Sequence, residues 1–384
     1  MNIKSLFLMA SWTVLLNSCK PSSHDYFTFD PRTLKENEIT LSDIADDVTY
    51  LPLPNNFPVA KASKFNFTDR LIYFFSTDGI IAFDREQNQL KKIGSKGRGP
   101  GEYLFSSFFT IDEKTGKVYV LDQGDIVKTY SKTGEFLESI PLQKFGNSTS
   151  IDFFESVLFV TYAFQFGGSL YNWVIFDTSG NVIKKREIGI PAFSSIYGSS
   201  RATYKYGNRI YYWNNYIDTV FSVLPDLSVE PSFLIRPGEH RIPRTRDILL
   251  NPNEKYMTIS SIFETGRYIV IKYYYKNPIL LMYDKCERVS FVLNREYENN
   301  TFIGGIENNL DAGPTFLPDQ FTSENGREYM VGVIDPINIK AIVSSDKFNK
   351  SVPKYPEKTK ELKRLANSLK ETDNPVLMLV RLKK

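Results

Sequence analysis

The densest group of side chains with chemical potential lies in a basic segment, RPGEHRIPRTRD, at 236–247. Five basic side chains fall within it: Arg236, His240, Arg241, Arg244 and Arg246. The planar guanidinium of arginine suits a carboxylate, a phosphate or a sulfate, so the last four of these residues are candidate ligand-binding residues. The alternative is a solvated loop whose charges pair with Glu239 and Asp247.

A second candidate is the glycine-rich segment GRGPGEY at 97–103. Such a loop can wrap an anion with its backbone N–H groups, which makes Arg98, Glu102 and Tyr103 candidate ligand-binding residues. Its spacing is not that of a phosphate-binding P-loop, and no helical pattern follows to add a dipole. The alternative is a tight crossing between two structural units, where glycine supplies a positive φ.

Arrangements that would indicate catalysis are sparse. The chain has two histidines, His24 and His240, so no multi-histidine metal site is expected. A Ser-His-Asp triad would have to use His240, which has no nucleophile-elbow motif nearby. Paired carboxylates from distant segments stay open, although scattered aspartates more often form turns. We expect no metal and no cofactor, and assign no catalytic residue.

The overall charge argues against one class of partner. The 384 residues include 47 basic and 44 acidic side chains, interspersed, with a net charge of +3. This balance lacks the basic footprint of a nucleic-acid binder. An apolar fraction of 42% supplies a large core, and the 14% of aromatic residues suit pleated, half-buried surfaces.

The element that positions these segments is a repeated phrase. An apolar strand leads to an aromatic residue, a polar turn and a second strand, as in IIAFDREQNQL (80–90) and WVIFDTSGNVI (173–183). The residues after the aromatic lie 47, 46, 45 and 62 positions apart: Asp84, Ser131, Asp177, Ser222 and Asp284. A period near 45 with about four strands per unit predicts a β-propeller, an all-β ring of four-stranded antiparallel blades.

Strand patterns divide the ring into blades. Five blades are predicted at 61–95, 106–142, 149–189, 202–235 and 256–294. The Asn-Pro that opens NPILLMYDK in the fifth blade returns in NPVLMLVRLKK, so 374–383 is predicted to be the third strand of a sixth blade. The strand DVTYLPLP (47–54) then supplies its fourth, and both termini close the ring without open edges. One short helix is expected within an insertion at 337–373, from the charged run at 356–371.

The N-terminal segment has the pattern of a targeting signal. An apolar stretch from Leu6 to Leu16 follows Lys4 and is too short to span a bilayer. It ends in Leu-Asn-Ser-Cys, which resembles a bacterial lipobox and implies cleavage after residue 18 and lipidation of Cys19. An ordinary cleaved signal peptide is the alternative. We therefore expect a signal peptide (1–18), a polar tether (19–40) and a propeller (41–384) on the outer membrane of a Gram-negative bacterium, periplasmic or surface-exposed.

Lipidation of Cys19 has a consequence for the only other cysteine. With the sulfur of Cys19 acylated, no intrachain disulfide can form. Cys286 falls in a polar turn, DKCER, with no obvious partner. We expect it to be a structurally unremarkable thiol.

The second blade carries a family resemblance. The stretch from 93 to 140 resembles an NHL repeat, with the glycine-rich phrase leading to an apolar strand, a Gly-Lys turn and VYVLD. Together with the lipobox and NPVLMLVRLK, GRGPGEY is similar to the bacterial six-bladed β-propeller lipoproteins. This resemblance implies a fold and a location, not an activity.

The blade layout also separates two faces of the ring. Turns between third and fourth strands are short and polar, whereas the connections between blades, which carry both candidate segments, are longer and share a loop face. We predict a monomeric, non-enzymatic binding or scaffold protein that presents its loop face to a glycan, a peptide or an envelope protein. The alternative is a hydrolase or lyase with acidic and arginine side chains at the channel mouth.

Overall fold

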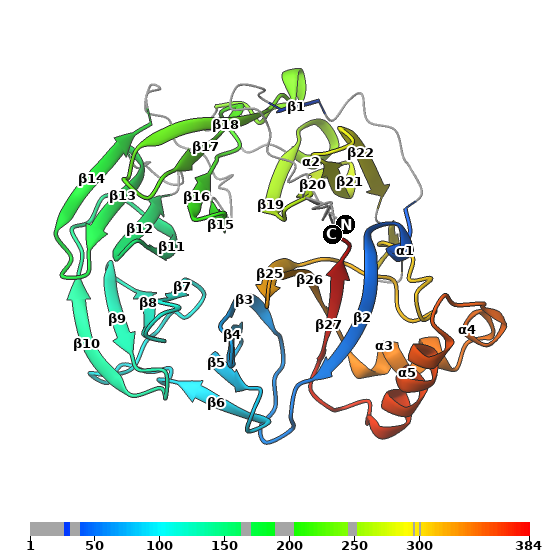
Figure 1. Ribbon diagram of the computed structural model, residues 1–384. Coiled ribbons are helices and arrows are strands. Elements are labelled where there is room, and N and C mark those ends of the chain that lie inside the picture. Colours follow the sequence, from blue (N-terminus) through cyan, green and yellow to red (C-terminus); the bar gives the residue numbers. More distant parts are fainter. Residues whose placement is uncertain are drawn as a thin grey trace, which may run out of the picture.

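The structure of the protein is a computed structural model. It describes residues 27–30, 39–162, 170–188, 203–244, 252–294, 296–298 and 301–384. Within these residues, six antiparallel sheets stand around a central channel (Figure 1). The prediction of a six-bladed propeller is confirmed.

The first three blades follow one another along the chain, each with its first strand at the channel and its fourth outermost. Blade 1 is made of β3 (Ser63–Phe67), β4 (Leu71–Ser76), β5 (Gly79–Asp84) and β6 (Gln89–Ile93). Blade 2 is made of β7 (Phe109–Ile111), β8 (Val118–Asp122), β9 (Ile126–Tyr130) and β10 (Phe136–Pro141). Blade 3 is made of β11 (Ser148–Phe154), β12 (Val157–Tyr162), β13 (Tyr171–Asp177) and β14 (Val182–Glu187).

The next two blades keep this order. Blade 4 is made of β15 (Thr203–Tyr206), β16 (Arg209–Tyr212), β17 (Thr219–Val223) and β18 (Val229–Ile235). Blade 5 is made of β19 (Thr258–Glu264), β20 (Tyr268–Tyr275), β21 (Asn277–Asp284) and β22 (Val289–Asn294). The blade 4 sheet gains a fifth strand, because β1 (Phe27–Phe29), from the expected tether, pairs in parallel with β18.

Blade 6 joins the two ends of the described chain. Its strands are β25 (Gln320–Glu324), β26 (Arg327–Ile334), β27 (Val376–Leu382) and β2 (Ala45–Pro52). The outermost strand β2 runs antiparallel to β27, with Val48 opposite Val380, and β27 runs antiparallel to β26. The predicted closure by strands from both ends is therefore confirmed, with both strands about two residues from their expected bounds.

The insertion between β26 and β27 holds three helices within the described chain: one confirms the helix expected from the charged run at 356–371, and the other two correct the expectation of a single helix. The three are α3 (Pro336–Val343), α4 (Asp346–Lys350) and α5 (Pro356–Ser368). Proline opens α3 and α5 at the first turn, where it costs no hydrogen bond, and the Ser345 hydroxyl accepts the Phe348 N–H to cap α4. The three helices lie outside the ring beside β2 and β27 (Figure 1).

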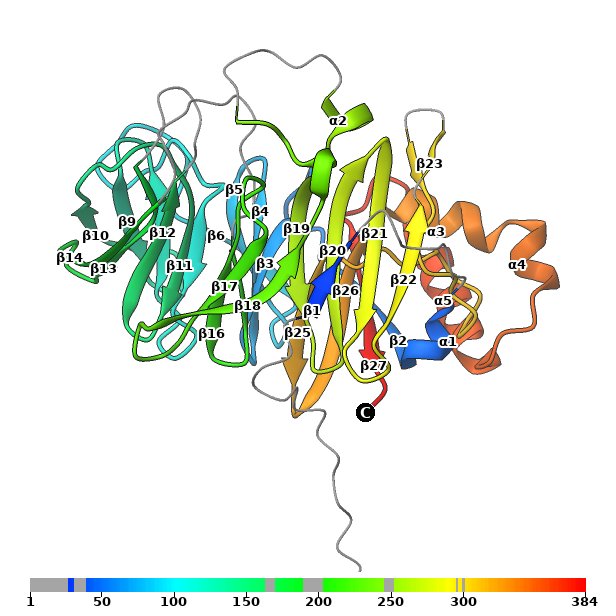
Figure 2. The ribbon, with the colours of Figure 1, turned by 90° about the horizontal axis from the view of Figure 1, so that it is seen from above.

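Short elements fill the connections. They are α1 (Leu41–Ile44), the 3₁₀ turn Gly238–His240, α2 (Pro252–Lys255) and the hairpin of β23 (Glu296–Glu298) and β24 (Thr301–Ile303). In the edge-on view, α2 and β23 project from one side of the ring, which is the loop face, and the C-terminus lies at the other (Figure 2).

The core lies between neighbouring blades. One cluster joins Tyr73 and Ile80 of blade 1 to Val118 and Tyr130 of blade 2, all at most 1% exposed. A similar cluster joins blade 5 to blade 6. Each sheet thus buries both faces against its neighbours, and the inner strands are fixed around the channel.

Candidate functional site

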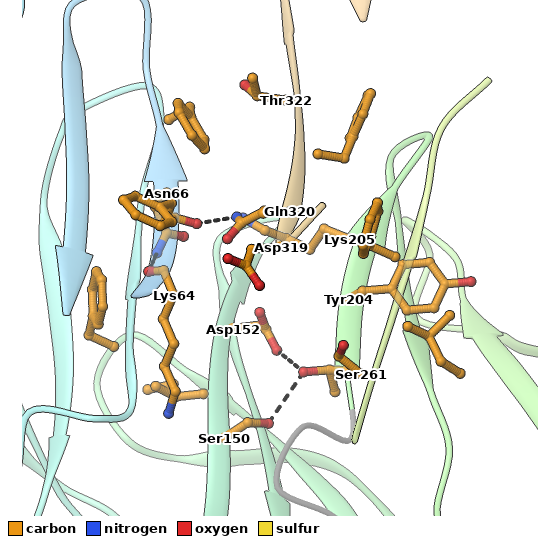
Figure 3. Close-up of a pocket in the computed structure, with 18 of the residues that line it drawn as sticks. Lys64, Asn66, Ser150, Asp152, Tyr204, Lys205, Ser261, Asp319, Gln320 and Thr322 are labelled. Atoms are coloured by element: carbon orange, nitrogen blue, oxygen red, sulfur yellow. Dashed lines mark hydrogen bonds between the residues drawn. The ribbon is translucent and has the colours of Figure 1, made fainter. Parts of the chain in front are cut away.

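The candidate site is a pocket of about 350 Å³ in the central channel. Every blade contributes to its wall through its first strand or the residues just before it. Side chains of β3, β11, β15, β19 and β25 surround the same space (Figure 3). The volume lies near the lower end of small-molecule sites, so the pocket is large enough for one compact ligand.

Strand alternation decides which side chains reach this pocket. In β3, Phe65 is 2% exposed and packs between blades, while Lys64 and Asn66 on either side of it face the channel. In β11, Ile151 is buried and its neighbour Asp152 faces the pocket. Successive side chains of a strand point to opposite faces, so polar residues gather on the axis.

One wall is a hydroxyl and carboxylate network between blades 3 and 4. The Thr203 hydroxyl donates to the Asp152 carboxylate at 2.6 Å and lies 3.4 Å from the Ser150 hydroxyl (Figure 3). Burial raises the pKa of Asp152, an effect that the Lys205 charge and the Thr203 hydrogen bond oppose. Lys205 itself forms an ion pair with Glu113 at 3.2 Å.

A second wall holds a buried ion pair. Glu264 at the end of β19 accepts a hydrogen bond from Lys285 at 2.8 Å and another from the Tyr204 hydroxyl at 3.1 Å. The Lys285 ammonium also donates to the Thr265 carbonyl and lies 4.8 Å from the centre of the Tyr206 ring. Burial raises the pKa of Glu264, against the opposing charge of Lys285.

The remaining charged groups of the pocket wall also form hydrogen bonds within the protein. Asp319 accepts a hydrogen bond from Lys272 at 2.6 Å, and the Lys64 ammonium donates to the Ser107 carbonyl at 2.6 Å. Neither arginine nor histidine occurs among the described residues that line the pocket. The site therefore offers fixed hydrogen-bond partners and no carboxylate without a donor, an arrangement suited to binding.

The glycine-rich segment lies between blades 1 and 2 and serves the fold. Tyr103 is 1% exposed, and its hydroxyl accepts the Ile80 N–H at 3.0 Å and donates to the Ile93 carbonyl at 2.8 Å. The Glu102 carboxylate accepts the Gly99 N–H at 2.8 Å and so closes its own loop. Arg98 is exposed. None of the three lines the pocket.

Replacement of Tyr103 by phenylalanine tests this structural role. We expect Tyr103→Phe to lower the free energy of unfolding by roughly 1–3 kcal/mol, since it leaves a buried N–H and a buried carbonyl without their partner. The exposed Arg98→Ala is the matched control from the same loop, with an expected change within about 0.5 kcal/mol. Urea unfolding measures both. Equal effects of the two variants would contradict the assignment.

The described side chains of the basic segment form hydrogen bonds and an ion pair with neighbouring groups of the protein. The Arg241 guanidinium donates to the Tyr216 carbonyl at 3.2 Å and pairs with Asp218, and Arg244 donates to the same carbonyl at 3.2 Å. His240 lies 3.1 Å from the Lys255 carbonyl and 3.4 Å from the Tyr275 hydroxyl. Arg246 lies outside the described residues. The described members of this segment are absent from the pocket wall.

Sequence reasoning missed the pocket residues. The available signal was the alternation of polar and apolar residues in the first strands, as in SKFNF (63–67) and TYKY (203–206). Half of each such strand must face the channel once the ring closes. The sequence does not show that the first strands of the six blades line one common pocket, because these strands become neighbours only in the folded ring.

Cys286 corrects a further expectation. The structure gives it a disulfide bond in place of the expected thiol, and a lipid on Cys19 would exclude that bond. The chain's other cysteine, Cys19, lies outside the described residues.

In the part of the chain that the structure describes, no three His, Cys, Asp or Glu side chains group in a way that could hold a metal ion. In the same part of the chain, none of the helices has the length and apolar character needed to cross a bilayer.

Comparison with known proteins finds one family and several solved structures. The family described as "Domain of unknown function (DUF4934)" matches residues 26–381. No curated protein matches the chain. A Bacteroides fragilis protein described as a "putative exported protein" is 19% identical with a TM-score of 0.69, covering 93% of this chain and 99% of its own. A member of the DUF4221 family from Bacteroides vulgatus is 12% identical with a TM-score of 0.50, covering 91% and 100%. At these identities the likeness concerns the fold alone.

Proposed function

The chain belongs to the family described as a domain of unknown function, DUF4934, and we propose that it is a non-enzymatic binding protein that takes a small ligand in its central channel. The family assignment carries no activity, so the proposal depends on the site. It moves the binding site from the loop face, where sequence reasoning placed it, to the inner strands.

One observation supports binding most strongly. The pocket has walls from six blades, and its carboxylates are each held by a hydrogen bond or an ion pair from the protein. A glycosidase-type mechanism needs two carboxylates that face one bond, one able to give a proton and one able to attack or to activate water. Carboxylates held by Lys272, Lys285 and Thr203 are better placed to fix the wall than to perform this chemistry.

A blocked channel tests the proposal. Thr322 of β25 lines the pocket, and Thr322→Trp places a large side chain in it. We expect small molecules from a binding screen that stabilise the wild-type protein to thermal unfolding to lose this effect in Thr322→Trp. Ile183→Trp on the exposed strand β14 is the matched control and should bind like the wild type. Ligands that bind Thr322→Trp with unchanged affinity would overturn the channel as the binding site.

The expected location is part of the same proposal. We propose a monomer that is exported and held at a Gram-negative outer membrane by a lipid on Cys19, which places the channel near envelope ligands. The lipobox resemblance supports this. The chain has two cysteines, so a disulfide between them and a thioether-linked lipid on Cys19 would use the same sulfur.

The intact mass of the membrane-associated protein separates these two states. Lipidation predicts an added diacylglyceryl group, one alkylatable thiol at Cys286, and release of Cys19→Ala from the membrane fraction. A protein without the lipid mass, and with neither thiol open to alkylation before reduction, would contradict the anchor. That result would leave the channel proposal intact.

A further inference from the structure

The charged groups of the channel wall are held by partners within the protein. The Lys64 ammonium donates to the Ser107 carbonyl and the Asp152 carboxylate accepts from the Thr203 hydroxyl, while the other charges form ion pairs. Lys205 pairs with Glu113, Lys272 with Asp319 and Lys285 with Glu264, at N–O distances of 3.2, 2.6 and 2.8 Å. A charged ligand would have to break such a pair or leave its own charge poorly solvated in the pocket, and both are costly. The wall therefore disfavours ions.

The side chains of the pocket wall that remain available for hydrogen bonds to a ligand are uncharged. Asn66 and Gln320 lie on neighbouring blades, and Gln320 is oriented by the donation of its amide N–H to the Phe65 carbonyl (Figure 3). Among the described residues, the side-chain oxygens of Asn66, Gln320, Ser261 and Thr322 have no protein partner. Two amide carbonyls can accept and two hydroxyls can both donate and accept. A ligand rich in hydroxyl groups satisfies such a set.

Aromatic side chains complete the wall. Phe67, Phe108 and Phe321 line the pocket and are half-buried. The C–H groups of a sugar ring can pack against such surfaces while its hydroxyls reach the amides. A purely apolar ligand would leave the amide groups of Asn66 and Gln320 without partners.

These observations fit one class of ligand. We propose that the central channel binds a neutral mono- or disaccharide, with Gln320, Thr322 and Ser261 among its hydrogen-bond partners. The inference depends on the proposed function, because it names the ligand of the same site. Because the ligand carries no charge, the interaction should be nearly insensitive to salt, since screening acts on the attraction between charges.

Calorimetric titration of the full protein with defined sugars tests the proposal. The neutral probes are glucose, galactose, mannose, N-acetylglucosamine, maltose and cellobiose, and the charged probes are glucuronate, glucosamine and glucose 6-phosphate. We expect saturable binding of at least one neutral probe, with the charged counterpart at least about tenfold weaker because of its desolvation cost. Affinity should change less than about twofold between low and moderate salt.

Matched variants assign the binding to the channel. Thr322→Val and Ser261→Ala each remove one hydroxyl and should weaken the sugar by roughly three- to tenfold, with unchanged thermal unfolding of the free protein. Gln143→Ala, an exposed residue after β10, should bind like the wild type.

The outcomes separate this inference from the proposed function. If no neutral sugar binds, or if charged probes bind as tightly, the sugar inference is overturned. Ligands of another class that are lost in Thr322→Trp would still support the channel as a binding site. Sugar binding that survives both Thr322→Val and Thr322→Trp would overturn both proposals.

Discussion

Asn374→Ala is expected to lower the free energy of unfolding by roughly 3 kcal/mol, because it leaves one buried and two partly buried backbone groups without their partner. Asn374 is 5% exposed and stands just before β27. Its carbonyl oxygen accepts the Val59 N–H at 2.7 Å, and its amide donates to the carbonyls of Pro54 and Phe57 at 2.7 and 2.8 Å. One side chain thus ties the strand that completes blade 6 to the segment that leads from β2 into blade 1.

The chain contains its own control for this change. Asn277 opens β21 with the same Asn-Pro pair, but it is exposed. Asn277→Ala should change the free energy of unfolding by no more than about 0.5 kcal/mol. Urea unfolding of both variants, followed by circular dichroism, makes the comparison. If the two variants lose similar stability, the ring is not held closed at Asn374.

Lys285→Ala is expected to cost about 3–5 kcal/mol at neutral pH, because it leaves the Glu264 carboxylate buried without its cation. The side chains of Lys285 and Glu264 are only 12% and 9% exposed. By contrast, Lys117→Ala breaks an ion pair with Glu138, whose side chain is 54% exposed, and should cost less than about 1 kcal/mol. Chemical unfolding at pH 7 measures both differences.

The pH dependence of Lys285→Ala has a defined sign. Burial raises the folded-state pKa of Glu264, and loss of Lys285 removes a group that opposes this rise. The protonated carboxyl is then favoured in the folded state, so stability is retained below the ordinary value of 4.5 and lost as pH rises through the raised pKa. The difference from the wild type should therefore be small at acid pH and grow toward neutrality. Addition of Glu264→Gln should recover most of the loss at pH 7, and a deficit independent of pH would contradict the mechanism.

The repeated phrase and the Asn-Pro echo were sufficient to predict the ring and its closure, since strand pattern and period are local properties. The repeated Asn-Pro pair could not show that Asn374 is buried with three hydrogen-bond partners while Asn277 is exposed. That difference arises from the segment 54–59, which folds over only one of them. The helices α3 and α4 were missed because they are short, although Pro336 and Ser345 mark their starts.

The candidate site could not be predicted in the same way. The basic and glycine-rich segments attract attention because their residues are neighbours in sequence, yet Arg241 and Tyr103 hydrogen-bond the protein's own backbone. The pocket instead joins Asn66, Asp152 and Gln320, which are far apart in sequence and meet only when the ring closes. The spacing of these residues along the chain therefore does not predict that they lie close together.

Hydrogen–deuterium exchange of the full protein, with and without a bound ligand, tests most directly whether the channel is the binding site. We expect slower exchange in peptides that contain the inner strands β3, β15, β19 and β25, from several blades at once. Slower exchange confined to 94–103 or 236–244, with the inner strands unchanged, would place the site on the loop face and contradict binding in the channel.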